Sequence, residues 1–249
     1  MNLNEATTQY DSAFASISGL TWLPWVGQNY STRPSHKRLL VVGESHYFIG
    51  KTSEERLANR EGRVKYLNYT RAVVSESLVN YEWTTKTLDT IPKLLIRSQT
   101  SEIDRPRMWG DSAYYNLVQR IMDYSQEGQP ERPAWNDYLA GWQVFADVVK
   151  IIQPSHCLFI GVSAANSFNH WIATQSAFCG NITCTQKIGG TWARAAKLEN
   201  VGTNLSSELA FVKHLGLPFS WAKWNEYLQG QHSNLISWLQ NERYNIHNS

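Results

Sequence analysis

The chain has 249 residues, a formal net charge of +2 and 42% hydrophobic residues. This length and composition exclude a disordered chain and predict one globular domain with a sizeable core. The small net charge excludes a uniformly basic surface, so contact with nucleic acid requires a local patch.

The cysteines and the apolar runs bound the setting of the protein. Cys157, Cys179 and Cys184 are too few and too irregularly spaced for a disulfide framework, a zinc site or an iron–sulfur cluster. Residues 1–20 lack the order of a signal peptide, and no apolar run reaches the length of a membrane span. We therefore expect a cytoplasmic protein that has no cofactor, no bound metal and no contact with a membrane.

The N-terminal half begins with a polar arm and one buried strand. We expect residues 1–36 to form a helical arm within a single domain that spans residues 1–249. The apolar run 39–42 ends at Gly43, which is typical of a strand buried on both faces. Residues 86–110 are rich in Pro, Ser, Arg and Gly and predict irregular structure, whereas the apolar spacing over 113–124 predicts a helix.

The C-terminal half alternates between helix and strand patterns. Apolar residues recur with a helical period over 142–152, and Pro154 ends that helix. Short apolar runs predict strands at 157–160, 182–188 and 209–212. A segment of small residues predicts a helix at 164–172, and the chain closes with a helix over 225–243 that is interrupted near Gly230. Together they predict an α/β fold, a three-layer α/β/α sandwich with a short, mostly parallel central sheet.

Reactive side chains follow two of these predicted strands. Segment 42–47 reads Val-Gly-Glu-Ser-His-Tyr, and His214 follows the run 209–212. Ligands bind at the carboxyl ends of strands in open α/β sheets. The two segments therefore predict one composite active site.

The order of motifs resembles that of the uracil-DNA glycosylase superfamily over roughly residues 36–240. One branch of that superfamily writes its water-activating motif Gly-Gln-Asp-Pro-Tyr-His, and its iron–sulfur branch writes Gly-Glu-Ala-Pro-Gly. Gly43 matches both branches, Glu44 matches the second and Tyr47 the first. His214 takes the place of the histidine in the superfamily's His-Pro-Ser motif, and segment 219–228 resembles the Phe-Ser-…-Asn-Glu-Tyr-Leu that follows it.

The chain departs from those motifs at several positions. Ser45 replaces the aspartate of the first branch and His46 its proline. Leu215 and Gly216 replace the Pro and Ser of His-Pro-Ser, and the iron–sulfur cysteines are missing from the sequence. These changes favour a pocket reshaped for a base other than plain uracil. One branch of the superfamily attacks hypermodified cytosines of viral DNA, so defence against phage is a narrower hypothesis.

The resemblance implies a role for each motif residue. Glu44 would activate water or stabilise the sugar cation, Ser45 would hold that water, and His214 would donate a hydrogen bond to the departing base. The residues that would contact the flipped base or form the wall of its pocket are Gly43, His46, Tyr47, Asn116 and Gly216. A basic run would contact DNA phosphates, and it consists of Lys51, Arg56, Arg60 and Arg63.

Each motif residue also has a structural interpretation. Glu44 is also suited to capping a helix, His46 and His214 are compatible with buried, hydrogen-bonded histidines, and the basic run is compatible with a solvated helix face. Two other functions stay open: a non-catalytic DNA-binding protein of this fold, and a serine hydrolase that uses Ser45. The second lacks the glycine that the Gly-x-Ser-x-Gly turn needs at Tyr47.

We therefore expect a monofunctional DNA glycosylase that leaves an abasic site, with DNA as its partner and no obligate protein partner. Neither motif holds a lysine placed to form the Schiff base of a lyase, although Lys213 is adjacent to His214.

Overall fold

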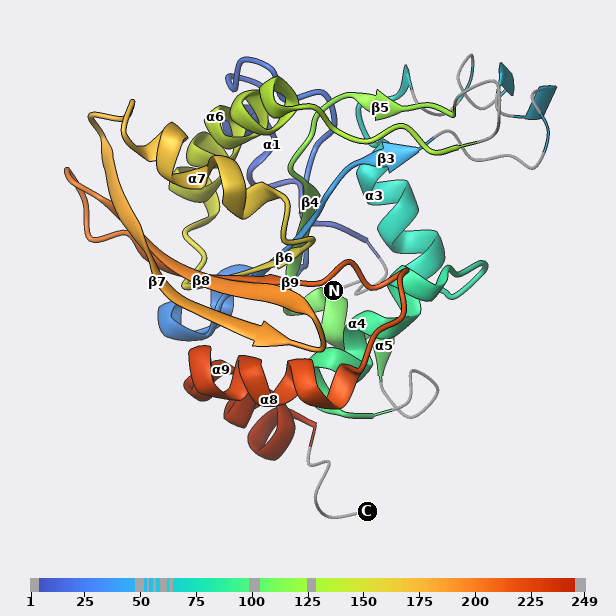
Figure 1. Cartoon of the computed structure of the whole chain (residues 1–249). Helices are drawn as coiled ribbons and strands as arrows, with labels where there is room; N and C mark the ends of the chain where they lie inside the picture. The colour runs from blue at the N-terminus through green and yellow to red at the C-terminus, as the bar shows by residue number, and fades with distance from the viewer. Residues whose placement is uncertain are drawn as a thin grey trace.

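The structure is a computed structural model of the chain. It describes residues 5–47, 52, 54–55, 57–58, 62, 65–98, 104–124 and 129–244. Within these ranges a seven-stranded sheet runs through the molecule, and helices cover both of its faces (Figure 1). Among the same residues, no helix combines the length and the apolar character that crossing a membrane requires.

The sheet has the strand order β1-β4-β2-β6-β9-β8-β7. Its four central strands, β4, β2, β6 and β9, are parallel, whereas β1 and the β7–β8 hairpin are antiparallel additions at the two edges. A separate parallel pair joins β3 to β5. The strands are β1 (Trp25–Val26), β2 (Leu39–Gly43), β3 (His46–Tyr47), β4 (Ala113–Asn116), β5 (Ile121–Met122), β6 (His156–Ile160), β7 (Phe178–Ile188), β8 (Thr191–Asn200) and β9 (Ser206–Val212).

Helices form the two outer layers. On one face lie α1 (Asp11–Phe14), α6 (Trp135–Ile152) and α7 (Ala164–Ile172). On the other lie α4 (Lys86–Ile96), α5 (Arg105–Gly110), α8 (Trp221–Gln231), α9 (Ser233–Ser237) and the π-helical segments η4 (Val74–Val79) and η6 (Trp238–Arg243). The remaining helices are α3 (Tyr69–Val73), which packs on Trp22, and the 3-10 turns η1 (Tyr30–Thr32) and η2 (Ser35–Lys37).

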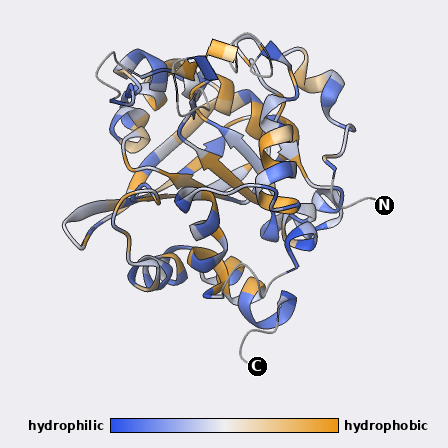
Figure 2. Ribbon diagram, turned by 90° about the vertical axis from the view of Figure 1, so that its right-hand side faces the viewer, coloured by the Kyte–Doolittle hydropathy of each residue, from blue (hydrophilic) through white to orange (hydrophobic). Residues whose placement is uncertain are grey.

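The central strands are buried on both faces because their side chains alternate between two cores. In β2, Leu40 and Val42 pack beneath α6, whereas Leu39 and Val41 pack against α4 and α8. β6 and β9 alternate in the same way. Figure 2 shows the hydrophobic segments gathered at the centre of the sheet. The structure therefore confirms the predicted α/β class with helices on both faces of a mostly parallel sheet.

Most of the predicted elements are confirmed in the structure. The segments 39–42, 157–160, 182–188 and 209–212 are strands, and 142–152 and 164–172 are helical. The C-terminal helix is interrupted at His232, between α8 and α9 and close to the expected Gly230. The N-terminal arm holds the short helix α1 and also supplies β1 to the sheet.

Two predicted segments were wrong. Residues 113–124 form β4 and β5 rather than a helix, because residues 113–116 are buried on both faces and pair with β2. Periodicity cannot separate such a strand from a buried helix. Residues 86–110 contain α4 and α5 rather than irregular structure. The Thr85 hydroxyl caps the N-terminus of α4 by accepting a hydrogen bond from the Leu88 NH, and the helix continues through Pro92.

The four parallel strands bring their carboxyl ends to one edge of the sheet. β4 ends at Asn116, β2 at Gly43, β6 at Ile160 and β9 at Val212. Ligand sites of open α/β sheets form at this edge. The edge is called the carboxyl edge below, and the opposite one the amino edge.

Candidate active site

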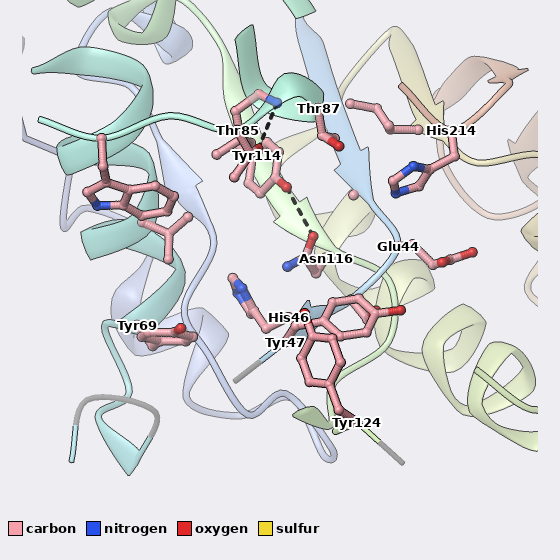
Figure 3. Close-up of a pocket in the computed structure, with 16 residues that line it drawn as sticks. Glu44, His46, Tyr47, Tyr69, Thr85, Thr87, Tyr114, Asn116, Tyr124 and His214 are labelled. Atoms are coloured by element: carbon pink, nitrogen blue, oxygen red, sulfur yellow. Dashed lines mark hydrogen bonds between the residues drawn. The ribbon is translucent and has the colours of Figure 1, made fainter. Parts of the chain in front are cut away.

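A cavity of about 400 Å³ opens at the carboxyl edge. Its wall includes seven of the residues predicted from the two motifs and the middle element: Gly43, Glu44, Ser45, His46, Tyr47, Asn116 and His214. Figure 3 labels Glu44, His46, Tyr47, Asn116 and His214 around one shared space. The remaining lining residues were not predicted; they are Tyr69, Val73, Trp83, Thr85, Thr87, Leu88, Tyr114, Tyr124 and Ile160.

Glu44 follows the last residue of β2 and is held by two partners from outside its own motif. The Tyr138 hydroxyl, on α6, donates a hydrogen bond of 2.7 Å to the carboxylate. The Arg132 guanidinium lies 3.9 Å from the other carboxylate oxygen. Burial, and then the charge of Glu44, raise the pKa of Tyr138, so its phenol remains a donor. Sequence reasoning missed Tyr138, because it lies 94 residues from Glu44 in a helix that carries no motif.

His214 is a neutral hydrogen-bond donor. The backbone NH of Gly216 donates to its Nδ1 at 3.2 Å, so the proton of the neutral ring is on Nε2. Burial lowers the pKa of His214; the charge of Glu44 opposes this shift and that of Arg132 adds to it. A neutral imidazole with a free Nε2–H can donate a hydrogen bond without giving up its proton.

Gly216 does not line the cavity, contrary to the prediction that it contacts the base. It acts on His214 instead, through the hydrogen bond to Nδ1. A β-carbon at this position would lie 2.9 Å from Thr87 Oγ1 and 3.1 Å from His214 Cε1. A side chain at this position would therefore crowd Thr87 and the imidazole.

Asn116 ends β4 and lies in the cavity wall. The Tyr114 hydroxyl donates a hydrogen bond of 3.1 Å to its Oδ1 (Figure 3). Among the described residues, none accepts a hydrogen bond from the Asn116 amide nitrogen, so this group can donate to a ligand. A side chain on Gly43 would collide with Oδ1 and with the Tyr114 hydroxyl, so the glycine makes room for this pair. Asn116 was predicted on a helix but lies on a strand.

His46 and Ser45 have surroundings that differ from those of Glu44 and His214. His46 Nε2 lies 2.8 Å from Thr70 Oγ1, and its ring packs on Trp22 and Tyr69 at centroid distances of 5.1 and 4.8 Å. Burial lowers the pKa of His46 to about 3, so it is neutral and satisfied. Ser45 Oγ is buried and has no hydrogen-bond partner among the described residues, which leaves it without a base.

Aromatic rings form part of the cavity wall. Tyr47 donates its hydroxyl proton to the Glu131 carbonyl at 2.8 Å and packs against Tyr124, with ring centroids 5.9 Å apart. Tyr69 and Trp83 line the same space from the segment between β3 and α4. Such rings offer faces on which a planar base can stack.

A second cavity of about 520 Å³, the outer cleft, begins where the first one ends. Glu44 and His214 border both cavities. The outer cleft also has Arg132, Lys213 and Leu217 in its wall. Leu217 is 44% exposed although it is apolar, and it belongs to the loop that carries His214.

The predicted DNA-contacting residues Lys51, Arg56, Arg60 and Arg63 lie outside the described residues. Arg71, which follows these residues in the sequence, is buried; its guanidinium pairs with Asp11 at 2.6 Å and donates to the Pro24 carbonyl. This arginine is therefore structural.

The sequence matches no protein-family model and no curated protein.

Proposed function

We propose that the protein is a monofunctional DNA glycosylase. The observation that carries the proposal is the meeting of a carboxylate and a neutral imidazole donor, Glu44 and His214, at the boundary between an aromatic cavity and an open cleft with two basic residues. The resemblance of both motifs to the uracil-DNA glycosylase superfamily points the same way.

The two cavities suit the two ends of a flipped nucleotide. The base enters the aromatic cavity, the sugar lies at Glu44 and His214, and the phosphates run along the outer cleft. Arg132 and Lys213 contact phosphates there. Leu217 is a wedge that fills the gap left in the base stack, a task for which proteins use apolar side chains.

The reaction breaks the bond between C1′ of the sugar and the ring nitrogen of the base. The Nε2–H of His214 donates to a base carbonyl oxygen as negative charge develops there. The Glu44 carboxylate stabilises the oxocarbenium-like sugar and orients a water molecule. It accepts a proton from that water as the water oxygen bonds to C1′. The base departs as an anion and takes a proton from solvent, which leaves an abasic site.

The cavity favours a modified pyrimidine as the base. Its volume of about 400 Å³ is within the range of sites that enclose drug-sized ligands, so a base with a bulky substituent fits. The free amide nitrogen of Asn116 donates to a carbonyl oxygen of such a base. A substrate of this kind fits a cytoplasmic role in defence against phage with modified cytosine.

The test is release of free base from duplexes and single strands. The substrates carry uracil, hypoxanthine, hydroxymethylcytosine or glucosylated hydroxymethylcytosine, and cleavage of the product by alkali is the readout. We expect one substrate to be cleaved, and Glu44→Gln and His214→Ala to lower its rate about 10²–10⁴-fold. Glu199→Gln, at a partly exposed glutamate on β8, is the matched control and keeps the wild-type rate.

DNA binding and fluorophosphonate labelling, measured beside base release, separate the alternatives. DNA binding without base release from any substrate would contradict catalysis and support a DNA-binding protein. Labelling of Ser45 by a fluorophosphonate would support a serine hydrolase instead, although the unpartnered Ser45 hydroxyl weighs against that reaction.

A further inference from the structure

Three metal-ligating side chains meet at the amino edge of the sheet, away from the cavity. His156 begins β6, Glu208 lies opposite it on β9, and His232 lies between α8 and α9. The five residues of β6 separate this cluster from the carboxyl edge by about 13 Å. The mechanism proposed above uses none of the three.

Their ligand atoms form a nearly equilateral triangle. The two Nδ1 atoms, of His156 and His232, are 3.0 Å apart. A carboxylate oxygen of Glu208 lies 3.3 Å from the first and 3.4 Å from the second. Ligands bound tetrahedrally to zinc at 2.0–2.1 Å are about 3.3 Å from one another, so the triangle has the size of one face of that tetrahedron.

A backbone contact fixes the tautomer of His156. Its Nε2 lies 3.1 Å from the carbonyl oxygen of His36, which can only accept, so Nε2 carries the proton and Nδ1 presents a lone pair. Histidines that bind metals usually donate the other ring NH in this way. The ring planes of His156 and His232 are 84° apart, so they do not stack.

We propose that His156, Glu208 and His232 bind a divalent transition-metal ion, with zinc as the first candidate. Two imidazoles and a carboxylate are a donor set that zinc accepts, and a solvent molecule completes the tetrahedron beside Glu208, whose side chain is 54% exposed. The ion joins β6 and β9 to the junction of α8 and α9 and stabilises the packing of the C-terminal helices. This proposal does not depend on the proposed glycosylase activity.

The charges of the groups around the cluster suit a cation. Glu208 supplies the negative charge, and each imidazole supplies a nitrogen ligand once its Nδ1 carries no proton. Lys197, the nearest cation from β8, is paired with Glu199 at 2.7 Å.

Without a metal ion, the two histidines would share one proton between their Nδ1 atoms. His232 Nε2 is buried with no hydrogen-bond partner among the described residues. That nitrogen lacks a partner in either state: it is an acceptor when Nδ1 of His232 carries the proton, and a donor when Nδ1 binds a metal ion. The experiment must therefore distinguish a bound ion from a hydrogen bond between the two rings.

The test uses the untagged full chain, stripped with EDTA and then titrated with Zn²⁺ or Co²⁺. We expect one ion per chain, a higher Tm with Zn²⁺, and visible Co²⁺ absorption bands of the intensity that four-coordinate sites give. Glu208→Gln should weaken Zn²⁺ binding at least about tenfold. His170→Ala, at a histidine outside the triangle, should bind as the wild type does.

A second measurement, on the wild-type chain alone, does not depend on whether a variant folds. Nitrogen NMR of the histidine rings should show the Nδ1 resonances of two histidines shift when Zn²⁺ is added. Unchanged Nδ1 resonances, failure of the stripped chain to take up one ion, or equal affinity in Glu208→Gln would overturn the proposal.

Discussion

The two edges of the central sheet use similar side chains at different spacing. At the carboxyl edge, Glu44 and His214 face a cavity of about 400 Å³, and each is held by a partner that leaves an acceptor or donor free. At the amino edge, the ligand atoms of Glu208 and two histidines lie within 4.8 Å of one another. The first arrangement has room for an organic molecule, and the second only for an ion. Spacing, rather than residue type, decides which chemistry each edge can do.

Exchanging glutamate for glutamine at each edge tests this comparison with the largest expected effect. Glu44→Gln should lower the rate of base release about 10²–10⁴-fold, since it removes the charge that stabilises the sugar cation, while Zn²⁺ affinity stays unchanged. Glu208→Gln should weaken Zn²⁺ binding and leave the rate of base release unchanged. Single-turnover base release and Zn²⁺ titration of both variants measure the two effects, and a variant that lowered both equally would contradict two independent sites.

The tautomer of His214 gives a smaller, separate test. Gly216→Ala should push the loop from the imidazole and release Nδ1, so base release should slow about tenfold or more while Tm changes little.

Because burial lowers the pKa of His214, the acid limb of the wild-type rate profile should lie below pH 6.5. A profile whose acid limb lies above pH 6.5 would contradict a buried, neutral donor.

The wedge at Leu217 should act on duplex DNA more than on single strands. Leu217→Ala removes the side chain that fills the stack but leaves Glu44 and His214 in place, so base release from a duplex should fall several-fold. Base release from a single strand, which has no pair to open, should change less. Equal losses on both substrates would assign Leu217 to the cavity rather than to base flipping.

His46 predicts an effect on stability at acid pH rather than on base release. Its pKa is about 3 in the folded protein, against 6.5 when exposed. The unfolded chain therefore binds more protons between these values, and the free energy of unfolding falls by up to about 1.4 kcal/mol for each unit of pH lost between 6.5 and 3. Urea unfolding across this range should show the slope in the wild type and a shallower one in His46→Gln. Equal slopes would remove His46 as its source.

The sequence predicts three of the four central parallel strands, β2, β6 and β9. β2 and β6 were predicted because both alternate between two cores and appear as short, continuous apolar runs. β4 was mistaken for a helix, although its last residue, Asn116, was a correct choice for the cavity. A buried strand and a buried helix share the same apolar composition, so only pairing with β2 separates them.

Partners distant in the chain could not be predicted. Tyr138 contacts Glu44 only once α6 packs on the sheet, and no local pattern marks it. His156 and His232 are 76 residues apart and meet only when α8 and α9 fold against the amino edge. The expectation of a metal-free protein rested on the cysteines, which take no part in this histidine–carboxylate triangle.

Single-turnover base release from DNA with glucosylated hydroxymethylcytosine and from DNA with uracil tests the proposed glycosylase reaction. We expect free base and an alkali-sensitive abasic site from one of them, no trapping of a Schiff base by borohydride, and loss of release in Glu44→Gln. Equal DNA binding by the wild type and Glu44→Gln, with no base released by either, would contradict it.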